Sequence, residues 1–275
     1  MSCTAPPKID IQGHRGCRGL YPENSLPAFK KAIDLGVNTL EMDISISKDN
    51  RVVVSHEPFM NPIICFNSNG DEIPEEDAMS YNLYAMDYEE IKKYDCGTKV
   101  HPTFPDQKNQ KTFKPLLGDI FELVDSMNAA VRFNIELKSL PKHYGEYTPY
   151  PKEYVSIVLY EIEKSGFMFE VNLQSFDLNI LEEIKIQSPK MPVALLVDEG
   201  ENIDDKLLSL TYKPEIISPH YKLLTSDIVA EFQSVGYRII PWTINDAKDL
   251  REMISFQVDG IITDYPDRLI KLLKI

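Results

Sequence analysis

Two carboxylates stand two residues apart in a largely apolar run, Glu41 and Asp43. In an extended strand, residues at this spacing point to the same side, so both carboxylates share one face. Glu136 lies in a similar run, between Ile135 and Leu137. Carboxylates gathered on one inward face repel one another and lose hydration, and a cation relieves both costs. Without thiolates or an imidazole cluster, three carboxylates suit a hard divalent ion, Mg²⁺ or Ca²⁺.

Buried ion pairs are the competing explanation for these acids, with Lys138 or Arg15 as the partner. For a single carboxylate, an ion pair is the better explanation. For three carboxylates at the ends of strands, the metal is the better one. The sequence therefore predicts a divalent cation site at Glu41, Asp43 and Glu136.

His14 and His56 are two of the five histidines in the chain. Imidazole titrates near neutral pH, so two such rings can serve as general base and general acid on opposite sides of a phosphorus atom. Arg15 and Lys138 could hold the non-bridging phosphate oxygens, Arg as a planar fork and Lys as a point charge. Taken singly, each of these four side chains is more often structural or solvated.

Two further features near expected strand ends have structural explanations. Trp242, the only Trp, would form a wall for a glycerol or alcohol moiety, although core packing explains it nearly as well. Glu23 and Asn24 precede a helical pattern, and we interpret them as capping residues that complement the helix dipole.

Short β-rich runs alternate with helical patterns along the chain. Apolar spacing near 3.6 predicts helices at residues 26–35, 120–126, 154–164, 178–186, 226–235 and 247–254. The expected strands are residues 9–14, 39–46, 131–138, 171–176, 193–197, 215–220, 238–244 and 260–264. Eight βα repeats predict a closed (β/α)8 TIM barrel, with active-site residues at the carboxyl ends of the strands. A doubly wound open sheet is the alternative, but the expected GxGxxG turn is absent.

The second repeat departs from this alternation. After Asp43 the chain stays β-like, turns at residues 48–50 and continues as Val52 to His56, which predicts a hairpin that returns His56 to the level of Asp43. Residues 57–115 then show weak periodicity, and a structureless loop of that length is unusual in a compact domain. We expect one catalytic domain, 1–275, carrying an inserted subdomain, 57–115, on the carboxyl face of the barrel.

The composition restricts the partners of the chain. Its net charge of −14 argues against nucleic acid, and no run approaches the roughly 18 apolar residues of a transmembrane helix. We expect a small-molecule partner, with a cation and local basic residues reversing the negative field in the site. The sequence does not indicate an oligomeric state.

The cysteines and the N-terminus bear on the compartment. Cys3, Cys17, Cys65 and Cys96 form no CxxC pair, which predicts free thiols rather than a disulfide framework or a zinc site. The N-terminus as written lacks the basic and apolar regions of a signal peptide, which predicts a cytoplasmic protein. If the chain was trimmed before Cys3, it would instead be exported or lipid-anchored.

An ordered set of motifs between about residues 9 and 270 resembles the glycerophosphodiester phosphodiesterase family. The motifs are His14-Arg15-Gly16, Pro22-Glu23-Asn24-Ser25, Glu41-Met42-Asp43, Val54-Ser55-His56, Ile135-Glu136-Leu137-Lys138, Gln174-Ser175-Phe176, Pro241-Trp242-Thr243-Ile244-Asn245 and Asp259-Gly260-Ile261-Ile262-Thr263-Asp264-Tyr265-Pro266. No single motif is specific, but their order is. The family's fold is a (β/α)8 barrel with an insertion after strand two.

The resemblance implies a role for each matching residue. His14 and His56 would be the acid–base pair; Glu41, Asp43 and Glu136 would hold Mg²⁺ or Ca²⁺; Arg15 and Lys138 would contact the phosphate, with Gln174 and Trp242 also at the substrate. Family enzymes convert a glycerophosphodiester, such as glycerophosphocholine, to an alcohol and glycerol 3-phosphate. The chain departs from the family pattern at Glu57, where Asp is usual after the second histidine, and at Ser25, where Thr is common.

Three other functions compete with this one. A lysophospholipase D or related phospholipid phosphodiesterase would use the same residues with a different insertion. A non-catalytic barrel would have no need of both histidines, all three acids and both cations. A lyase of the enolase type would want a base at a later strand, where His220 is the one weak candidate.

Overall fold

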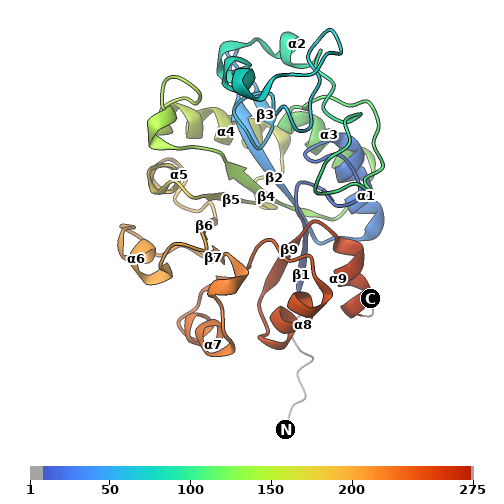
Figure 1. The fold of residues 1–275 in the computed structure, drawn as a ribbon. Coiled ribbons are helices and arrows are strands. Elements are labelled where there is room, and N and C mark those ends of the chain that lie inside the picture. The colour runs from blue at the N-terminus through green and yellow to red at the C-terminus, as the bar shows by residue number, and fades with distance from the viewer. Residues whose placement is uncertain (1–8, 274–275) are drawn as a thin grey trace.

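The computed structural model describes residues 9–273, which form a ring of parallel strands enclosed by helices (Figure 1). The strands of the ring are β1 (Asp10–Gly13), β2 (Thr39–Ile46), β4 (Arg132–Leu137), β5 (Val171–Ser175), β6 (Val193–Val197), β7 (Ile216–Pro219), β8 (Arg238–Ile239) and β9 (Gly260–Thr263). The helices that follow them are α1 (Leu26–Leu35), α3 (Leu117–Ser126), α4 (Pro151–Ser165), α5 (Leu178–Gln187), α6 (Ile203–Leu208), α7 (Ser226–Ser234), α8 (Ala247–Ser255) and α9 (Pro266–Leu273). The predicted (β/α)8 barrel is confirmed.

The strands pair in the order β8-β7-β6-β5-β4-β2-β1-β9, and all of these neighbours are parallel. Single backbone hydrogen bonds join the two ends of this order. The amide of Asp259 donates to the Ile239 carbonyl at 2.9 Å, and the amide of Ile262 donates to the Pro241 carbonyl at 3.0 Å. Because Pro241 has no N–H to donate, this seam lacks a regular ladder.

Alternation along the strands separates two environments. Leu40, Met42 and Ile44 of β2 join the hydrophobic core beneath the helices, as do Phe133 and Ile135 of β4. The intervening residues face the barrel interior, as expected for successive side chains of a strand. There Asn134 donates to Gln12 at 2.9 Å and to Gln174 at 3.0 Å, whereas the β6–β9 side carries an apolar cluster of Ala194, Ile216, Ile240 and Ile262.

Most predicted elements agree with the structure to within a few residues. The bounds of β2, β6 and α1 coincide with the prediction. The strand expected at residues 238–244 is shorter, because Pro241 interrupts it. Helices α6 and α9 were not predicted.

Strand β3 (Val52–Val54) returns antiparallel to β2, as the hairpin prediction required. Its register corrects one detail. Ile44 pairs with Val54, and the Ser55 amide donates to the Asp43 carbonyl at 2.9 Å. Ser55 therefore lies opposite Asp43, and His56 is one residue beyond it.

Residues 57–115 gather beside β3 (Figure 1) and contain three short helical elements, η1 (Glu75–Ser80), η2 (Leu83–Ala85) and α2 (Tyr88–Ile91). Side chains from this segment form a hydrophobic cluster separate from that of the barrel. Its members include Met60, Ile64, Leu83 and Ile91, and Val53 of β3 joins them. The part of the segment that carries this cluster packs on β3, whereas Phe104 and Gln107 contact Arg18, in the loop between β1 and α1.

The prediction of free thiols throughout was wrong. Cys65 and Cys96 form a disulfide within this segment, whereas Cys17 is a buried free thiol and Cys3 lies outside the described residues. The two cysteines are 31 positions apart. Such a pairing leaves no local signature in the sequence, because it depends on how the whole segment folds.

Replacing both disulfide cysteines, Cys65→Ser with Cys96→Ser, should destabilise the segment. Loop-closure entropy for a separation of 31 residues predicts a loss of about 2–4 kcal/mol in its free energy of unfolding. Hydrogen exchange across residues 57–115 measures this loss. Reductant should produce the same change in the wild type and none in the double variant; a wild type insensitive to reductant would contradict the expectation.

Candidate active site

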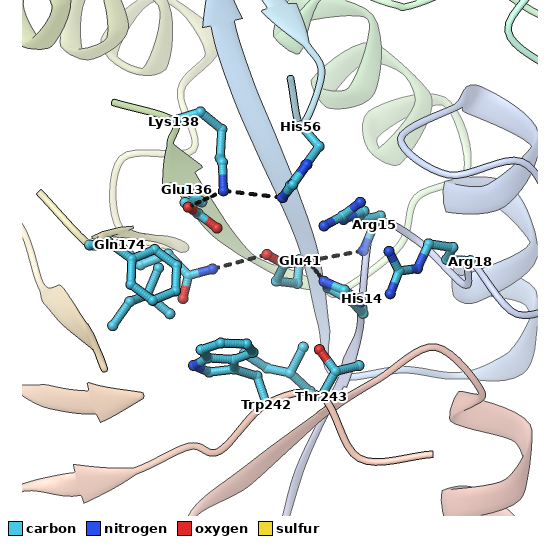
Figure 2. Close-up of a pocket in the computed structure, with 13 residues that line it drawn as sticks. His14, Arg15, Arg18, Glu41, His56, Glu136, Lys138, Gln174, Trp242 and Thr243 are labelled. Carbon is cyan, nitrogen blue, oxygen red and sulfur yellow. Dashed lines mark hydrogen bonds and ion pairs between the residues drawn. The ribbon is translucent and has the colours of Figure 1, made fainter. Parts of the chain in front are cut away.

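A cavity of about 180 Å³ opens at the carboxyl ends of the barrel strands (Figure 2). Every predicted site residue except Asp43 lines it, and Asp43 forms an ion pair with the lining residue Arg15. The lining residues are His14, Arg15, Arg18, Glu41, His56, Glu136, Lys138, Gln174, Phe176, Leu196, Trp242, Thr243 and Ile262. The structure thus brings together residues from both ends of the chain.

The three acids converge because β2 and β4 are neighbours in register. Asp43 pairs with Glu136 across the two strands, and Glu41 precedes Asp43 on the same face. One carboxylate oxygen from each of the three lies within 4.8 Å of the others, and all three residues are buried. Three hard oxygen donors at this separation fit a divalent cation such as Mg²⁺ or Ca²⁺.

Ion pairs neutralise two of the acids but not the third. Arg15 Nε lies 3.0 Å from Asp43 Oδ2, and Lys138 Nζ lies 2.7 Å from Glu136 Oε1. Glu41 instead accepts hydrogen bonds from the Arg15 amide and from Gln174 Nε2, each at 2.9 Å. Among residues 9–273 no Lys or Arg side chain pairs with Glu41, so the competing ion-pair explanation accounts for only part of the cluster.

The pKa values of the acids reflect this imbalance. Burial and the neighbouring Asp43 raise the pKa of Glu41 well above its usual range. Burial would also raise the pKa of Asp43, but Arg15, His56, Lys138 and His14 together outweigh burial and hold that pKa below its usual range. A divalent cation would remove the repulsion that disfavours an ionised Glu41.

His14 follows β1 and is held by a buried carboxylate at the end of β9. Its Nδ1 lies 2.6 Å from Asp264 Oδ1, which turns Nε2 toward Glu41, 3.9 Å away. Burial lowers the pKa of His14 to about 4, although Asp264 opposes this. His14 therefore presents a neutral ring nitrogen to the cavity at neutral pH.

His56 follows β3 and is oriented from both sides. Its Nδ1 lies 2.7 Å from Glu57 Oε1, and Lys138 Nζ donates to its Nε2 at 3.2 Å. Beneath it, the buried Lys114 donates to Ser55 Oγ at 2.8 Å. Glu57, which replaces the Asp usual in the family, thus contacts His56 directly.

The loop between β1 and α1 requires two residues in the left-handed conformation, Arg15 at φ 50° and Asn24 at φ 52°. Arg15 uses it to place its amide on Glu41 and its guanidinium on Glu23 and Asp43. Gly16 follows at φ 85°, where a Cβ would lie 2.8 Å from Ala28. The close approach of loop and helix therefore needs glycine.

The capping roles expected for Glu23 and Asn24 were wrong. Ser25 caps α1 by accepting from the Ala28 amide. Glu23 Oε1 accepts from Arg15 Nη1 at 2.8 Å, and Asn24 Nδ2 donates to Asp43 at 2.9 Å. Both residues turn inward and support the site because the loop is left-handed at Asn24.

Three residues that the sequence analysis did not single out for a role also shape the site. Arg18 Nε donates to Asp264 at 2.9 Å and its guanidinium stacks 4.8 Å from the centre of the Phe104 ring. Asp264 orients His14, and Lys114 donates to Ser55, the residue before His56. The position of Asp264 at a strand end was a usable signal, whereas Arg18 and Lys114 lie in irregular segments without one.

Trp242 lines the cavity opposite His56 and Lys138 (Figure 2). Its Nε1 donates to the Ser218 carbonyl at 2.8 Å, and its ring meets that of Phe176 edge-on at 5.5 Å. His220 packs against Trp242 but does not line the cavity. The structure therefore does not bring this alternative base to the acids.

Comparison with known proteins agrees with this geometry. The model of the glycerophosphoryl diester phosphodiesterase family matches residues 14–268. A glycerophosphodiester phosphodiesterase from Caldanaerobacter subterraneus subsp. tengcongensis is 29% identical over 97% of this chain and 98% of its own. A lysophospholipase D from Rattus norvegicus is 24% identical over 93% of this chain and 83% of its own.

Solved structures show the same fold. A Silicibacter pomeroyi protein of inferred glycerophosphoryl diester phosphodiesterase function superposes with a TM-score of 0.88 at 28% identity, covering 98% of this chain and 94% of that one. An Oleispira antarctica phosphodiesterase in complex with the product sn-glycerol 3-phosphate gives 0.77 at 20% identity, covering 98% of both chains. With the family model matched over nearly the whole chain, and relatives of that name similar over its full length, this protein belongs to the glycerophosphodiester phosphodiesterase family of hydrolases.

Proposed function

We propose that this protein hydrolyses glycerophosphodiesters, for example glycerophosphocholine, to an alcohol and sn-glycerol 3-phosphate. The observation that carries the proposal is one cavity in which a buried carboxylate cluster lies beside two histidines and the basic side chains of Arg15 and Lys138. Relatives that carry the phosphodiesterase name support the reaction, and the Oleispira antarctica structure holds the corresponding product.

Glu41, Asp43 and Glu136 would hold the divalent cation, Mg²⁺ or Ca²⁺. Their oxygens suit a hard ion, and Glu41 in particular lacks a cationic partner in the described structure. When bound, such an ion supplies charge stabilisation to a phosphate oxygen and lowers the pKa of a coordinated hydroxyl.

The side chains of this chain supply the remaining steps. Arg15 and Lys138 would bind the non-bridging oxygens, while Gln174 and Trp242 would contact the glycerol or alcohol moiety. His14 and His56 reach the cavity from the ends of β1 and β3, which both pair with β2; one of them removes the proton of the attacking hydroxyl and the other protonates the leaving alcohol. If the attacking group is the substrate's own 2-hydroxyl, a cyclic phosphate forms and water then opens it; rapid-quench detection of that species distinguishes this route from direct attack by water.

We further propose that residues 57–115 are an inserted subdomain that influences substrate choice. The segment supplies Glu57 to His56 and Phe104 to Arg18, and it has a hydrophobic cluster of its own.

Metal dependence is the first expected outcome. EDTA should abolish release of glycerol 3-phosphate from glycerophosphocholine, and added Mg²⁺, Ca²⁺ or Mn²⁺ should restore it. Glu41→Gln should remove most of this activity at any of these metals, whereas the exposed Glu122→Gln on α3 should not. Release that persists in EDTA would count against the metal site, and activity on lysophosphatidylcholine alone would select the lysophospholipase D function.

The two histidines should each be needed for turnover. His14→Ala and His56→Ala should lower kcat by about 10²–10⁴-fold, the usual loss for a general acid or base. His101→Ala serves as the matched control, because its ring packs on Phe104 outside the cavity. A variant with near-normal kcat would remove that histidine from the mechanism.

Asp264 should act through His14. Asp264→Asn places an amide where His14 Nδ1 now meets a carboxylate, which weakens the orientation of the ring. We expect kcat to fall by about 10²-fold or more. The control is Asp10→Asn, which changes a buried aspartate at the other end of the barrel. The two variants should have similar melting temperatures. Equal kinetic effects of the two substitutions would mean that Asp264 has only a structural role.

A further inference from the structure

A second cavity, of about 300 Å³, adjoins the first and is mostly apolar. Its apolar lining comes from Pro58 and Phe59 on one side and Leu140 and Phe176 on the other. Leu140 remains 45% exposed at its edge, so the cavity is a groove open to solvent. Its size is at the lower end of the range for small-molecule sites.

The groove is continuous with the reaction site. His56, Glu136, Lys138 and Phe176 line both cavities. Figure 2 places Lys138 and His56 on the side of the first cavity that faces away from Trp242, which is the side on which the groove begins. A phosphate held by Arg15 and Lys138 would therefore direct one of its two ester substituents into the groove.

The walls of the groove are held in place by hydrogen bonds. The buried Asp177 accepts from Ser139 Oγ at 2.8 Å and from the Tyr144 hydroxyl, which fixes the segment that carries Leu140. Asn82 Nδ2 donates to the Glu146 carbonyl at 2.8 Å and so ties residues 57–115 to that segment. Both walls are thus built before any substrate arrives.

The charges around the groove disfavour a cationic occupant. The ammonium groups of Lys138 and Lys206 lie 5.7 and 5.5 Å from the centre of the Phe176 ring. A quaternary ammonium placed against that ring would meet two ammonium groups already there, each of them paired with a carboxylate, Lys138 with Glu136 and Lys206 with Glu201. The carboxylates of Glu57 and Glu136 are engaged by His56 and Lys138, respectively, and offer little compensation.

We propose that this groove binds the alcohol moiety of the phosphodiester and selects an uncharged alcohol with an apolar portion over choline. The inference rests on the proposed hydrolysis of glycerophosphodiesters and names the class of ester that the enzyme prefers. Burial of each added methylene on Phe59, Leu140 and Phe176 favours the longer alcohol.

The test compares synthetic esters of sn-glycerol 3-phosphate with the same metal-loaded enzyme. Ethyl, butyl and hexyl esters measure the effect of chain length, and kcat/KM should rise by up to about fourfold per buried methylene. The choline ester and its uncharged carbon isostere, the 3,3-dimethylbutyl ester, differ in charge alone. We expect the isostere to be preferred by about tenfold or more.

Variants then locate the effect. Leu140→Asp changes a half-exposed residue and should lower the hexyl-to-ethyl ratio of kcat/KM by about fivefold or more, as should Phe59→Ala. Phe169→Ala is the matched control, because Phe169 is 96% exposed just before β5, at the opposite end of the barrel. Thermal melting verifies that each variant is folded. If Phe59→Ala does not fold, the ester preference of Leu140→Asp alone tests the groove assignment.

The possible outcomes distinguish a failure of the groove assignment from a failure of the proposed hydrolysis of glycerophosphodiesters. Release of glycerol 3-phosphate that is equal for all esters, or fastest for the choline ester, would overturn the groove assignment and leave the hydrolase intact. A hexyl preference that Leu140→Asp and Phe169→Ala both preserve would also overturn it. No release from any ester would overturn the proposed function itself.

Discussion

The pairing of β2 with β4 forces three carboxylates into one buried space, where they repel one another. Residues at the carboxyl ends of several strands compensate for this repulsion. Asp43 and Glu136 are directly paired across the strands, so neither can turn away without breaking the register. The compensation comes from separate segments: Arg15 after β1, Lys138 after β4 and Gln174 on β5. Removing one partner of such a buried pair typically costs about 3–5 kcal/mol, because the other charge stays behind. The left-handed conformation of Arg15 is explained by the need to stabilise two of these carboxylates, because it lets the amide of Arg15 donate to Glu41 while its guanidinium pairs with Asp43.

The histidine rings are likewise held by charged and polar side chains from separate segments. Asp264 holds His14 and is itself held by Arg18 and Asn245, while Glu57 and Lys138 hold His56. Both rings are held through Nδ1; His14 presents its Nε2 to the cavity, whereas the Nε2 of His56 also accepts a hydrogen bond from Lys138. Hydrogen bonds and ion pairs hold the acids, the basic side chains and the rings in place; strands fix the acids and loops fix the rings.

Strand positions and most of the site could be predicted because both leave periodic signals. The carboxylates of β2 and β4 stand at strand spacing between apolar residues, and β2 itself was predicted to the residue. The hairpin placed His56 near the acids with an error of one position. What could not be predicted depends on contacts between distant residues: the Cys65–Cys96 disulfide, Lys114 beneath Ser55, and Arg18 on Asp264. Helix α6 was missed because its six residues span too few turns for a periodic pattern. Glu23 and Asn24 were misassigned because a left-handed residue, invisible to pattern analysis, turned them inward.

The seam between β8 and β9 has fewer and less regular backbone hydrogen bonds than the pairing of β2 with β4. Only scattered backbone hydrogen bonds cross it, because Pro241 cannot donate, whereas β2 and β4 on the far side share six registered positions. Trp242 and Thr243 continue from the seam and line the cavity opposite His56 and Lys138. The acids therefore stand on strands joined by a continuous ladder, whereas Trp242 and Thr243 stand where the ladder is interrupted. Local opening at such a seam costs less than opening within a continuous ladder. The spacing of the acids is therefore set by a ladder that does not include the seam, and we expect local opening of the barrel to begin at the seam rather than between the acids.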